Sequence, residues 1–125
     1  MSFDWLEYLD LARELAGQTT AASTQEAKWR SAISRAYYAA FCKARNCLRD
    51  KQGLSIPRTG QAHRIVWRQF KNSPDKSRKR IGENLRRLLN DRRQTDYEDV
   101  VSNLPVLTHK AVTRASEVVS VLGKL

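Results

Sequence analysis

The side chains of this chain that could do chemistry are mainly arginines and lysines, and they are clustered. Of its 125 residues, 23 are Lys or Arg and 13 are Asp or Glu, which gives a formal charge of +10. Residues 58–93 hold twelve basic and three acidic side chains, whereas residues 1–27 carry a net charge of −4. The densest basic runs include Arg78, Lys79, Arg80, Arg86 and Arg87. Because clustered cations bind polyanions by releasing condensed counterions, these runs indicate a surface for nucleic acid or an acidic protein.

The same residues also have a simpler interpretation, as a hydrated helix surface. Arginine outnumbers lysine 15 to 8, which favours bidentate contacts with phosphate or carboxylate groups. Arg92 and Asp96, however, are four residues apart and would face each other on a helix, so they could pair with each other instead. The pattern therefore leaves open which charged residues bind a partner and which support the fold.

Other kinds of functional site find little support in the sequence. His63, His109, Cys42 and Cys47 show no spacing typical of zinc ligands, and no carboxylate cluster is typical of calcium. The chain has neither a glycine-rich phosphate loop nor a Gly-x-Ser-x-Gly motif. We therefore expect no metal and no other cofactor. No apolar stretch reaches the roughly 18–20 residues of a membrane helix, and the first twenty residues are too acidic for a signal peptide. We expect a cytoplasmic protein.

Apolar residues recur at helical spacing along almost the whole chain, and no alternating run is long enough for a convincing strand. We predict an all-α fold, an up-and-down bundle of four to five helices within a single domain, residues 1–125. The expected helices cover about residues 2–16, 24–49, 61–71, 74 onward and 104–122. Tyr37 and Phe41 fall on the buried stripe of the second helix. Cys42 and Cys47 lie on different sides of that helix, so they cannot form a disulfide with each other.

Capping residues set the expected helix ends. Ser2 can cap the first helix, and Ser23 with Glu26 has the spacing of a capping box for the second. Ser73 can cap the fourth helix, with Pro74 as its first helical residue. Asn103 and Pro105 mark the start of the last helix. The glycines and proline within residues 51–60 predict a loop before the third helix.

Three segments resemble the small HEPN-domain proteins in their order and spacing. Residues 30–41 read Arg-Ser-Ala-Ile-Ser-Arg-Ala-Tyr-Tyr-Ala-Ala-Phe, residues 61–70 place a His before a Val and a Phe, and residues 92–97 read Arg-x-x-x-Asp-Tyr. The resemblance covers about residues 27–123 and implies a helical bundle that forms a homodimer. It also implies that relatives include metal-independent ribonucleases, and that short members pair with a minimal nucleotidyltransferase as toxin and antitoxin.

HEPN ribonucleases use an Arg followed, after four to six residues, by a His. The His moves the proton of the ribose 2′-hydroxyl, and the Arg offsets charge that grows on the phosphate. Where the resemblance places this pair, the chain has Arg92 and, after four intervening residues, Tyr97. A tyrosine with its ordinary pKa of about 10 is a poor proton shuttle at neutral pH. The same spacing occurs between Arg58 and His63, where the predicted loop meets the third helix.

The resemblance would also gather polar and aromatic residues on one face of the second and fourth helices, namely Arg35, Tyr38, Arg92, Asp96 and Tyr97. We therefore predict an interaction module whose basic middle binds RNA or a nucleotidyltransferase-type protein, without efficient catalysis. One alternative is a metal-independent endoribonuclease toxin that uses His63 with Arg58 or Arg92. Another is a structural adaptor for an acidic protein.

Overall fold

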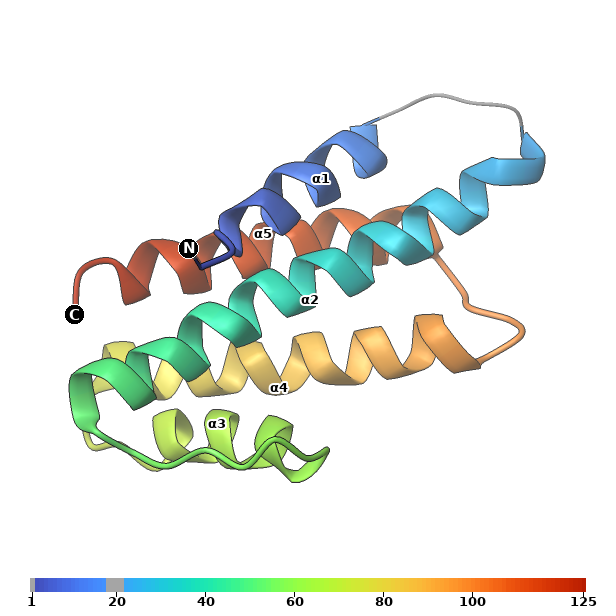
Figure 1. Ribbon diagram of the computed structural model, residues 1–125. Coiled ribbons are helices and arrows are strands. Elements are labelled where there is room, and N and C mark those ends of the chain that lie inside the picture. The colour runs from blue at the N-terminus through green and yellow to red at the C-terminus, as the bar shows by residue number, and fades with distance from the viewer. Residues whose placement is uncertain (1, 18–21) are drawn as a thin grey trace.

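The computed structural model describes residues 2–17 and 22–125, without the side chains of residues 22 and 23. Within these residues the chain forms five α-helices and no strand, so the predicted all-α class is confirmed (Figure 1). The helices are α1 (Leu6–Gly17), α2 (Ala22–Gln52), α3 (Gln61–Lys71), α4 (Lys76–Tyr97) and α5 (Leu104–Leu122). None of the described helices combines the length and the apolar character needed to cross a membrane.

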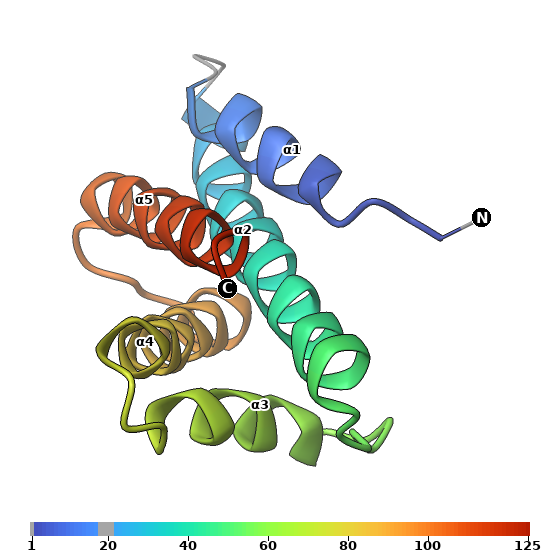
Figure 2. The ribbon, with the colours of Figure 1, turned by 90° about the vertical axis from the view of Figure 1, so that its left-hand side faces the viewer.

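Helix α2 is the central element, because it contacts each of the other four helices. Its 31 residues extend over roughly 46 Å at about 1.5 Å per residue. Small side chains let its neighbours approach closely, and five of its alanines are completely buried: Ala32, Ala36, Ala39, Ala40 and Ala44. Figures 1 and 2 show α1 and α3 on opposite sides of α2, with α3 lying across the ends of α2 and α4. The link between α2 and α3 therefore runs along the outside of the bundle.

The start of the first helix differs from the sequence prediction. Helix α1 begins at Leu6, not directly after Ser2, because a side-chain oxygen of Asp4 accepts a hydrogen bond from the Leu6 amide at 3.0 Å. A carboxylate satisfies an unpaired helix amide and also interacts favourably with the positive end of the helix dipole. Helix α2 begins at Ala22, two residues before the start predicted from Ser23, so the backbone of Ser23 lies within the helix. The side chain of Ser23, on which the predicted capping box with Glu26 depends, lies outside the described residues.

The start of α4 is also set by a carboxylate, and the predicted cap was wrong. The N-cap is Asp75, whose side chain accepts a hydrogen bond from the Arg78 amide at 3.0 Å. Ser73 accepts a bond from the Asp75 amide instead, at 3.2 Å, and Pro74 precedes the helix. The helix consequently begins at Lys76, two residues later than expected.

The remaining helix ends agree more closely with expectation. Helix α3 has the predicted bounds, and α5 follows Asn103, which has a left-handed φ of 55° and precedes Pro105 in the first turn. Helix α2 continues three residues beyond the predicted Arg49 and ends at Gln52, directly before Gly53. A φ of +66° at Gly53 is a conformation that glycine adopts without a Cβ clash, and it turns the chain toward the loop.

Contacts at two places, near Gly82 and at the C-terminal end, hold α4 against its neighbours. A Cβ at Gly82 would collide with backbone atoms of Trp67 and Lys71, so the glycine allows α3 and α4 to touch along their backbones. At the other end of α4, the Arg30 guanidinium of α2 donates to the carbonyl oxygens of Thr95 at 2.8 Å and Glu98 at 2.7 Å. Its positive charge also suits the negative end of the α4 dipole. Together these contacts position the residues near the end of α4 against α2 and α3.

Candidate nucleic-acid interface

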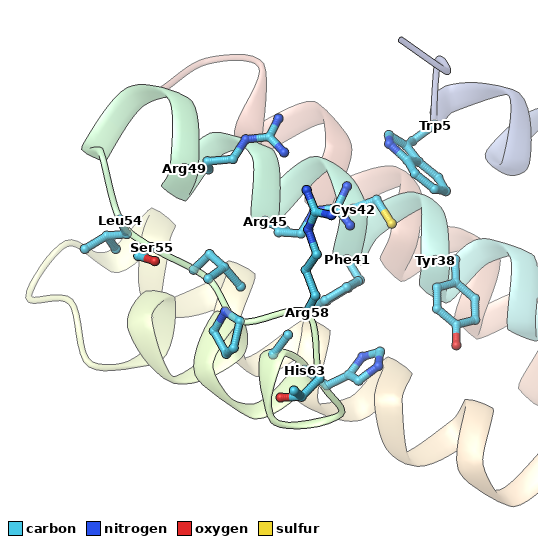
Figure 3. A pocket seen from close by; sticks show the side chains of 14 residues that line it. Trp5, Tyr38, Phe41, Cys42, Arg45, Arg49, Leu54, Ser55, Arg58 and His63 are labelled. Atoms are coloured by element: carbon cyan, nitrogen blue, oxygen red, sulfur yellow. The ribbon is translucent and has the colours of Figure 1, made fainter.

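A cleft of about 670 Å³ lies between α2 and the segment that leads from α2 into α3 (Figure 3). We call it the His63 cleft. Its aromatic lining residues are Trp5, Tyr38 and Phe41, and its charged or titratable ones include Arg45, Arg49, Arg58 and His63. The predicted pair of Arg58 and His63 therefore lies in one cleft, because the loop folds back along α2 before α3 begins.

The three arginines of the cleft are held differently. Arg49 pairs with Asp50 at 2.8 Å, and the Arg45 guanidinium lies 5.5 Å from the centre of the Trp5 ring. Arg58 is exposed and forms no hydrogen bond or ion pair within residues 2–17 and 22–125. Figure 3 shows its side chain extending from the loop toward the Arg45 side of the cleft. The cleft therefore carries positive charge that no neighbouring carboxylate fully neutralises.

His63 is fixed by aromatic neighbours from α2. Its Nδ1 is hydrogen-bonded to the Tyr37 hydroxyl at 2.5 Å, and its ring stacks on Phe41 with ring centres 4.5 Å apart. The Tyr38 ring meets it edge-on with centres 6.2 Å apart. Because Nδ1 is engaged, Nε2 is the ring nitrogen that can reach a ligand in the cleft.

The protonation of His63 is controlled by its surroundings. Burial lowers the pKa of His63 below its ordinary value of 6.5, and the positive charges of Arg92 and Arg93 lower it further. His63 is therefore neutral at pH 7 and can accept a proton. Burial also raises the pKa of Tyr37, with a smaller contribution from Tyr38, so the Tyr37 hydroxyl keeps its proton.

The structure brings together the residues that the family resemblance placed on one face of α2 and α4. Arg92 pairs with Asp96 at 2.8 Å, and its guanidinium lies 5.3 Å from the centre of the Tyr38 ring and 5.9 Å from that of Tyr97. The guanidinium of Arg35 lies 5.8 Å from the Tyr38 ring on the same cluster. Arg92 and Asp96 therefore do pair with each other, and the Arg92 guanidinium also lies beside Tyr38, which lines the His63 cleft.

The basic runs of α4 do not form one continuous surface. Arg80 pairs with Glu117 of α5 at 2.7 Å, and Arg78 lies over the Phe70 ring at 5.7 Å. Lys79 is exposed. These three residues lie in the first two turns of α4, apart from the His63 cleft. Arg86 and Arg87, by contrast, line a hollow against α3.

A second candidate site runs between α3 and α4 on the outside of the bundle. Two hollows of about 300 Å³ and 370 Å³ adjoin each other there and share Arg86 and Asn90. We call them together the α3–α4 groove. Its principal lining residues are Arg64, Trp67, Lys71, Arg86, Asn90 and Arg93. The only acidic residue that lines either hollow, among the described residues, is Glu83.

The Trp67 ring lies among three cations in this groove. Arg86 of α4 lies 5.4 Å from the centre of its ring, and Arg68 and Lys71 of α3 each lie 5.7 Å from it. Sequence reasoning missed this part of α3. A signal was present, because Arg64, Arg68 and Lys71 are spaced by four and three residues and so share one helix face.

The start of α3 contributes to both sites. His63 lines the cleft, and the next residue, Arg64, lines the groove. Arg93 also lines the groove, while its charge lowers the pKa of His63. The charge of one groove residue therefore acts on the titratable group of the cleft.

The remaining metal-ligating or nucleophilic side chains among the described residues form no further candidate site. No group of three His, Cys, Asp or Glu side chains among the described residues could hold a metal ion. Cys42 and Cys47 are free and buried, and burial raises the pKa of the Cys42 thiol, which makes it a weak nucleophile. His109 is exposed on α5.

Comparison with known families decides what kind of module this is. The family model of the HEPN domain matches residues 9–125. The chain belongs to the HEPN-domain family. HEPN domains are all-α and are generally nucleic-acid-associated, ribonuclease-like modules, in agreement with the resemblance noted in the sequence. No curated protein and no solved structure matched the chain.

Proposed function

We propose that this HEPN domain binds RNA and holds part of a single strand in the His63 cleft, without cleaving it efficiently. The observation that carries the proposal is the lining of the cleft, where three arginines meet three aromatic side chains. Arginines can contact phosphates, and aromatic rings can stack with unpaired bases. A volume of about 670 Å³ lies in the range of roughly 300–1,000 Å³ typical of small-ligand sites. Such a cleft suits one or two nucleotides of a single strand rather than a duplex.

Within one protomer, the cleft offers His63 alone for the two proton transfers that cleavage requires. Attack by the ribose 2′-hydroxyl needs a base, and departure of the 5′-oxygen needs an acid. Neutral His63 can supply the base at Nε2 in the tautomer whose Nδ1–H donates to the Tyr37 hydroxyl oxygen. The arginines stay protonated at all accessible pH values, and the Cys42 thiol has a raised pKa, so neither is poised to exchange a proton near pH 7. Arg92, the group best placed to offset charge beside His63, is paired with Asp96.

Binding of a labelled single-stranded RNA in EDTA, measured by fluorescence anisotropy, tests the proposal. We expect binding at about 50 mM salt that weakens steeply toward 200 mM, because phosphate contacts release counterions. Arg58→Ala should weaken binding several-fold. The matched control is Arg13→Ala, which removes the same charge from an exposed position on α1 where Arg13 pairs with Asp10. It should change the affinity less than twofold.

The outcomes separate the alternatives clearly. Intact RNA that binds the wild type more tightly than Arg58→Ala supports the proposal. Equal loss in Arg58→Ala and Arg13→Ala would show that total charge, not the cleft, drives binding. No binding at about 50 mM salt would overturn the proposal, and a stoichiometric acidic protein in the same preparation would then favour the adaptor function.

A second candidate function, metal-independent RNA cleavage, is favoured by one specific observation. Arg58 and His63 line the same cleft, and the charge of Arg92 acts on the His63 ring. If the protein is a ribonuclease, total RNA or tRNA should be cleaved in EDTA, and His63→Ala should abolish cleavage. Equal cleavage by the wild type and His63→Ala would indicate a contaminating nuclease and would end this alternative.

The biological setting follows from the family and is likewise a proposal. HEPN domains commonly dimerise, and we expect this one to form a homodimer in the cytoplasm. We further expect pairing with a nucleotidyltransferase-type protein as toxin and antitoxin. Light scattering of the purified protein tests the dimer, and co-expression with the protein encoded by the neighbouring gene tests the pairing. A monomer at about 100 µM, or separate elution of the two proteins, would contradict these expectations.

A further inference from the structure

The α3–α4 groove combines a cluster of basic side chains with an aromatic ring. Six basic residues line it or contact its central ring, and none forms an ion pair within residues 2–17 and 22–125: Arg64, Arg68, Lys71, Arg86, Arg87 and Arg93. Elsewhere on α4 the cations Arg80 and Arg92 do have carboxylate partners. The groove thus concentrates six cations beside a single lining carboxylate among the described residues, that of Glu83.

Trp67 indicates which kind of anion the groove can bind. Its side chain is partly exposed among cations that lie 5.4–5.7 Å from the ring centre. These distances are near the outer limit of about 6 Å for a cation–π contact, so a ligand can displace the cations without disrupting the fold. A base that stacks on Trp67 takes the place of one cation, and that cation becomes available to a phosphate.

We propose that the α3–α4 groove binds single-stranded RNA, with Trp67 as the platform for one base and Arg64, Arg86 and Arg93 as contacts to the phosphates. A single strand is favoured over a duplex because a duplex keeps its base faces stacked internally and offers Trp67 nothing to contact. Asn90 lies between the two hollows and is the uncharged polar group available to a base edge or a ribose hydroxyl.

The groove and the His63 cleft both begin at the start of α3. His63 and Arg64 are consecutive, and each lines one of the two sites. Along α3 the groove extends from Arg64 to Lys71, about 10 Å at 1.5 Å per residue. One strand can therefore occupy the cleft and then the groove. This part of the inference rests on the proposed function, because it takes RNA as the ligand of the cleft.

The test compares groove variants with a control on the same helix. Arg86→Ala removes a groove cation, whereas Arg80→Ala removes an exposed cation that pairs with Glu117 outside the groove. The probes are a labelled 12-nucleotide poly(U) RNA and a 12-base-pair RNA duplex, with circular dichroism to confirm folding of each variant. We expect Arg86→Ala to weaken poly(U) binding and to reduce the salt slope by about 1. Arg80→Ala should leave both nearly unchanged.

Trp67 tests the stacking part of the inference. Trp67→Leu should weaken poly(U) binding roughly 5- to 100-fold, because one base loses its aromatic stacking partner, while Trp67→Phe should retain most of the binding. Duplex binding should be weaker than poly(U) binding and insensitive to either change. If Trp67→Leu folds poorly, the two single variants Trp67→Phe and Arg93→Ala are compared instead. Arg93 is exposed, so Arg93→Ala should fold normally and weaken poly(U) binding, whereas Trp67→Phe should retain it.

The results distinguish failure of the groove from failure of the cleft. If Arg58→Ala weakens poly(U) binding but Arg86→Ala and Trp67→Leu do not, the groove inference is overturned and the proposed function stands. If Arg86→Ala and Arg80→Ala weaken binding equally, the groove has no special role. If groove variants alone lose binding, the groove inference stands and the assignment to the cleft fails. Absence of any poly(U) binding overturns both.

Discussion

The two sides of α4 carry arginines with different roles. On the side that faces α2 and α5, Arg92 pairs with Asp96, and Asp91 forms an ion pair with Arg114 of α5 at 3.4 Å. On the side that faces α3, Arg86 and Arg93 line a groove and form no ion pair among the described residues. The basic runs of the sequence do not reveal this division. The positions of the acidic partners in the fold reveal it. An arginine paired with a carboxylate supports the fold, whereas an unpaired arginine is available to an external anion.

The two candidate sites differ in the same way. The His63 cleft contains an imidazole whose pKa lies below its ordinary value of 6.5, whereas the basic residues of the α3–α4 groove are arginines and one lysine. Ligand binding at the groove should therefore respond mainly to salt, and binding at the cleft to salt and pH together.

Gly82→Ala should be the most damaging single substitution, because the added Cβ would collide with the backbone of Trp67 and Lys71. Backbone atoms cannot move aside as a flexible side chain can, so α3 must shift away from α4. We expect the free energy of unfolding to fall by about 3 kcal/mol or more, measured by urea denaturation. The α3–α4 groove should then lose affinity for poly(U), since its two walls separate.

Gly60→Ala is the matched control for this prediction. Gly60 has an ordinary helical conformation, with φ of −58°, and a Cβ there would meet nothing within 4 Å. Its substitution should change the free energy of unfolding by less than about 0.5 kcal/mol. Equal effects of Gly82→Ala and Gly60→Ala would refute the close helix contact.

Arg30→Met should have the second-largest effect, because Arg30 is an arginine with a structural role. Its guanidinium bonds the carbonyl oxygens of Thr95, Glu98 and Asp99, and it pairs with Glu26 at 3.2 Å. Loss of these charge-assisted bonds should lower the free energy of unfolding by about 2 kcal/mol in urea denaturation.

Arg87→Met provides the comparison for Arg30→Met. Arg87 is exposed and has no ion pair within the described part of the chain, so its substitution should change stability by less than about 0.5 kcal/mol. If both variants lose similar stability, the division into structural and available arginines is wrong.

The helices could be predicted from sequence more accurately than the sites. Apolar spacing alone identifies the helix at residues 61–71, and Asn103 with Pro105 correctly marks the start of α5. Competing caps were harder, since a serine and an aspartate stand close together before α1 and before α4, and the aspartate prevails in both. Which of two nearby side chains reaches the first amides depends on the path of the preceding chain.

The sites depend on how helices cross, which sequence spacing does not encode. Tyr37 and His63 are 26 residues apart and meet only because α3 folds back along α2. Gly82 looks like a destabilising residue inside α4 until α3 is placed against it. The pairing of Arg92 with Asp96, by contrast, could be predicted, because both residues belong to one helix and are four apart.

Arg92→Met should have a smaller effect on stability and a specific effect on His63. Removal of the pair with Asp96 and of the contact with Tyr38 should cost about 1 kcal/mol. Because the charge of Arg92 lowers the pKa of His63, its loss should raise that pKa toward the ordinary value of 6.5. NMR titration of the imidazole protons measures the shift, with His109 as the internal reference. An unchanged or lower pKa in Arg92→Met would show that the two groups do not interact.

The smallest expected effect is the contribution of His63 to the pH dependence of stability. Burial and two arginine charges lower its pKa in the folded state, so the unfolded chain binds a proton more readily. The contribution of His63 to the free energy of unfolding should therefore be fully present above pH 6.5. It should be lost as the pH falls from 6.5 toward the lowered pKa of the folded state. His63→Gln cannot titrate, so the free energy of unfolding between pH 7.5 and 5 should fall less in this variant than in the wild type. A matching fall in both would mean that His63 is as easily protonated in the folded protein as in the unfolded chain. The cleft would then hold a charged imidazolium rather than a neutral base at mildly acidic pH, and the contrast with the permanently charged groove would disappear there.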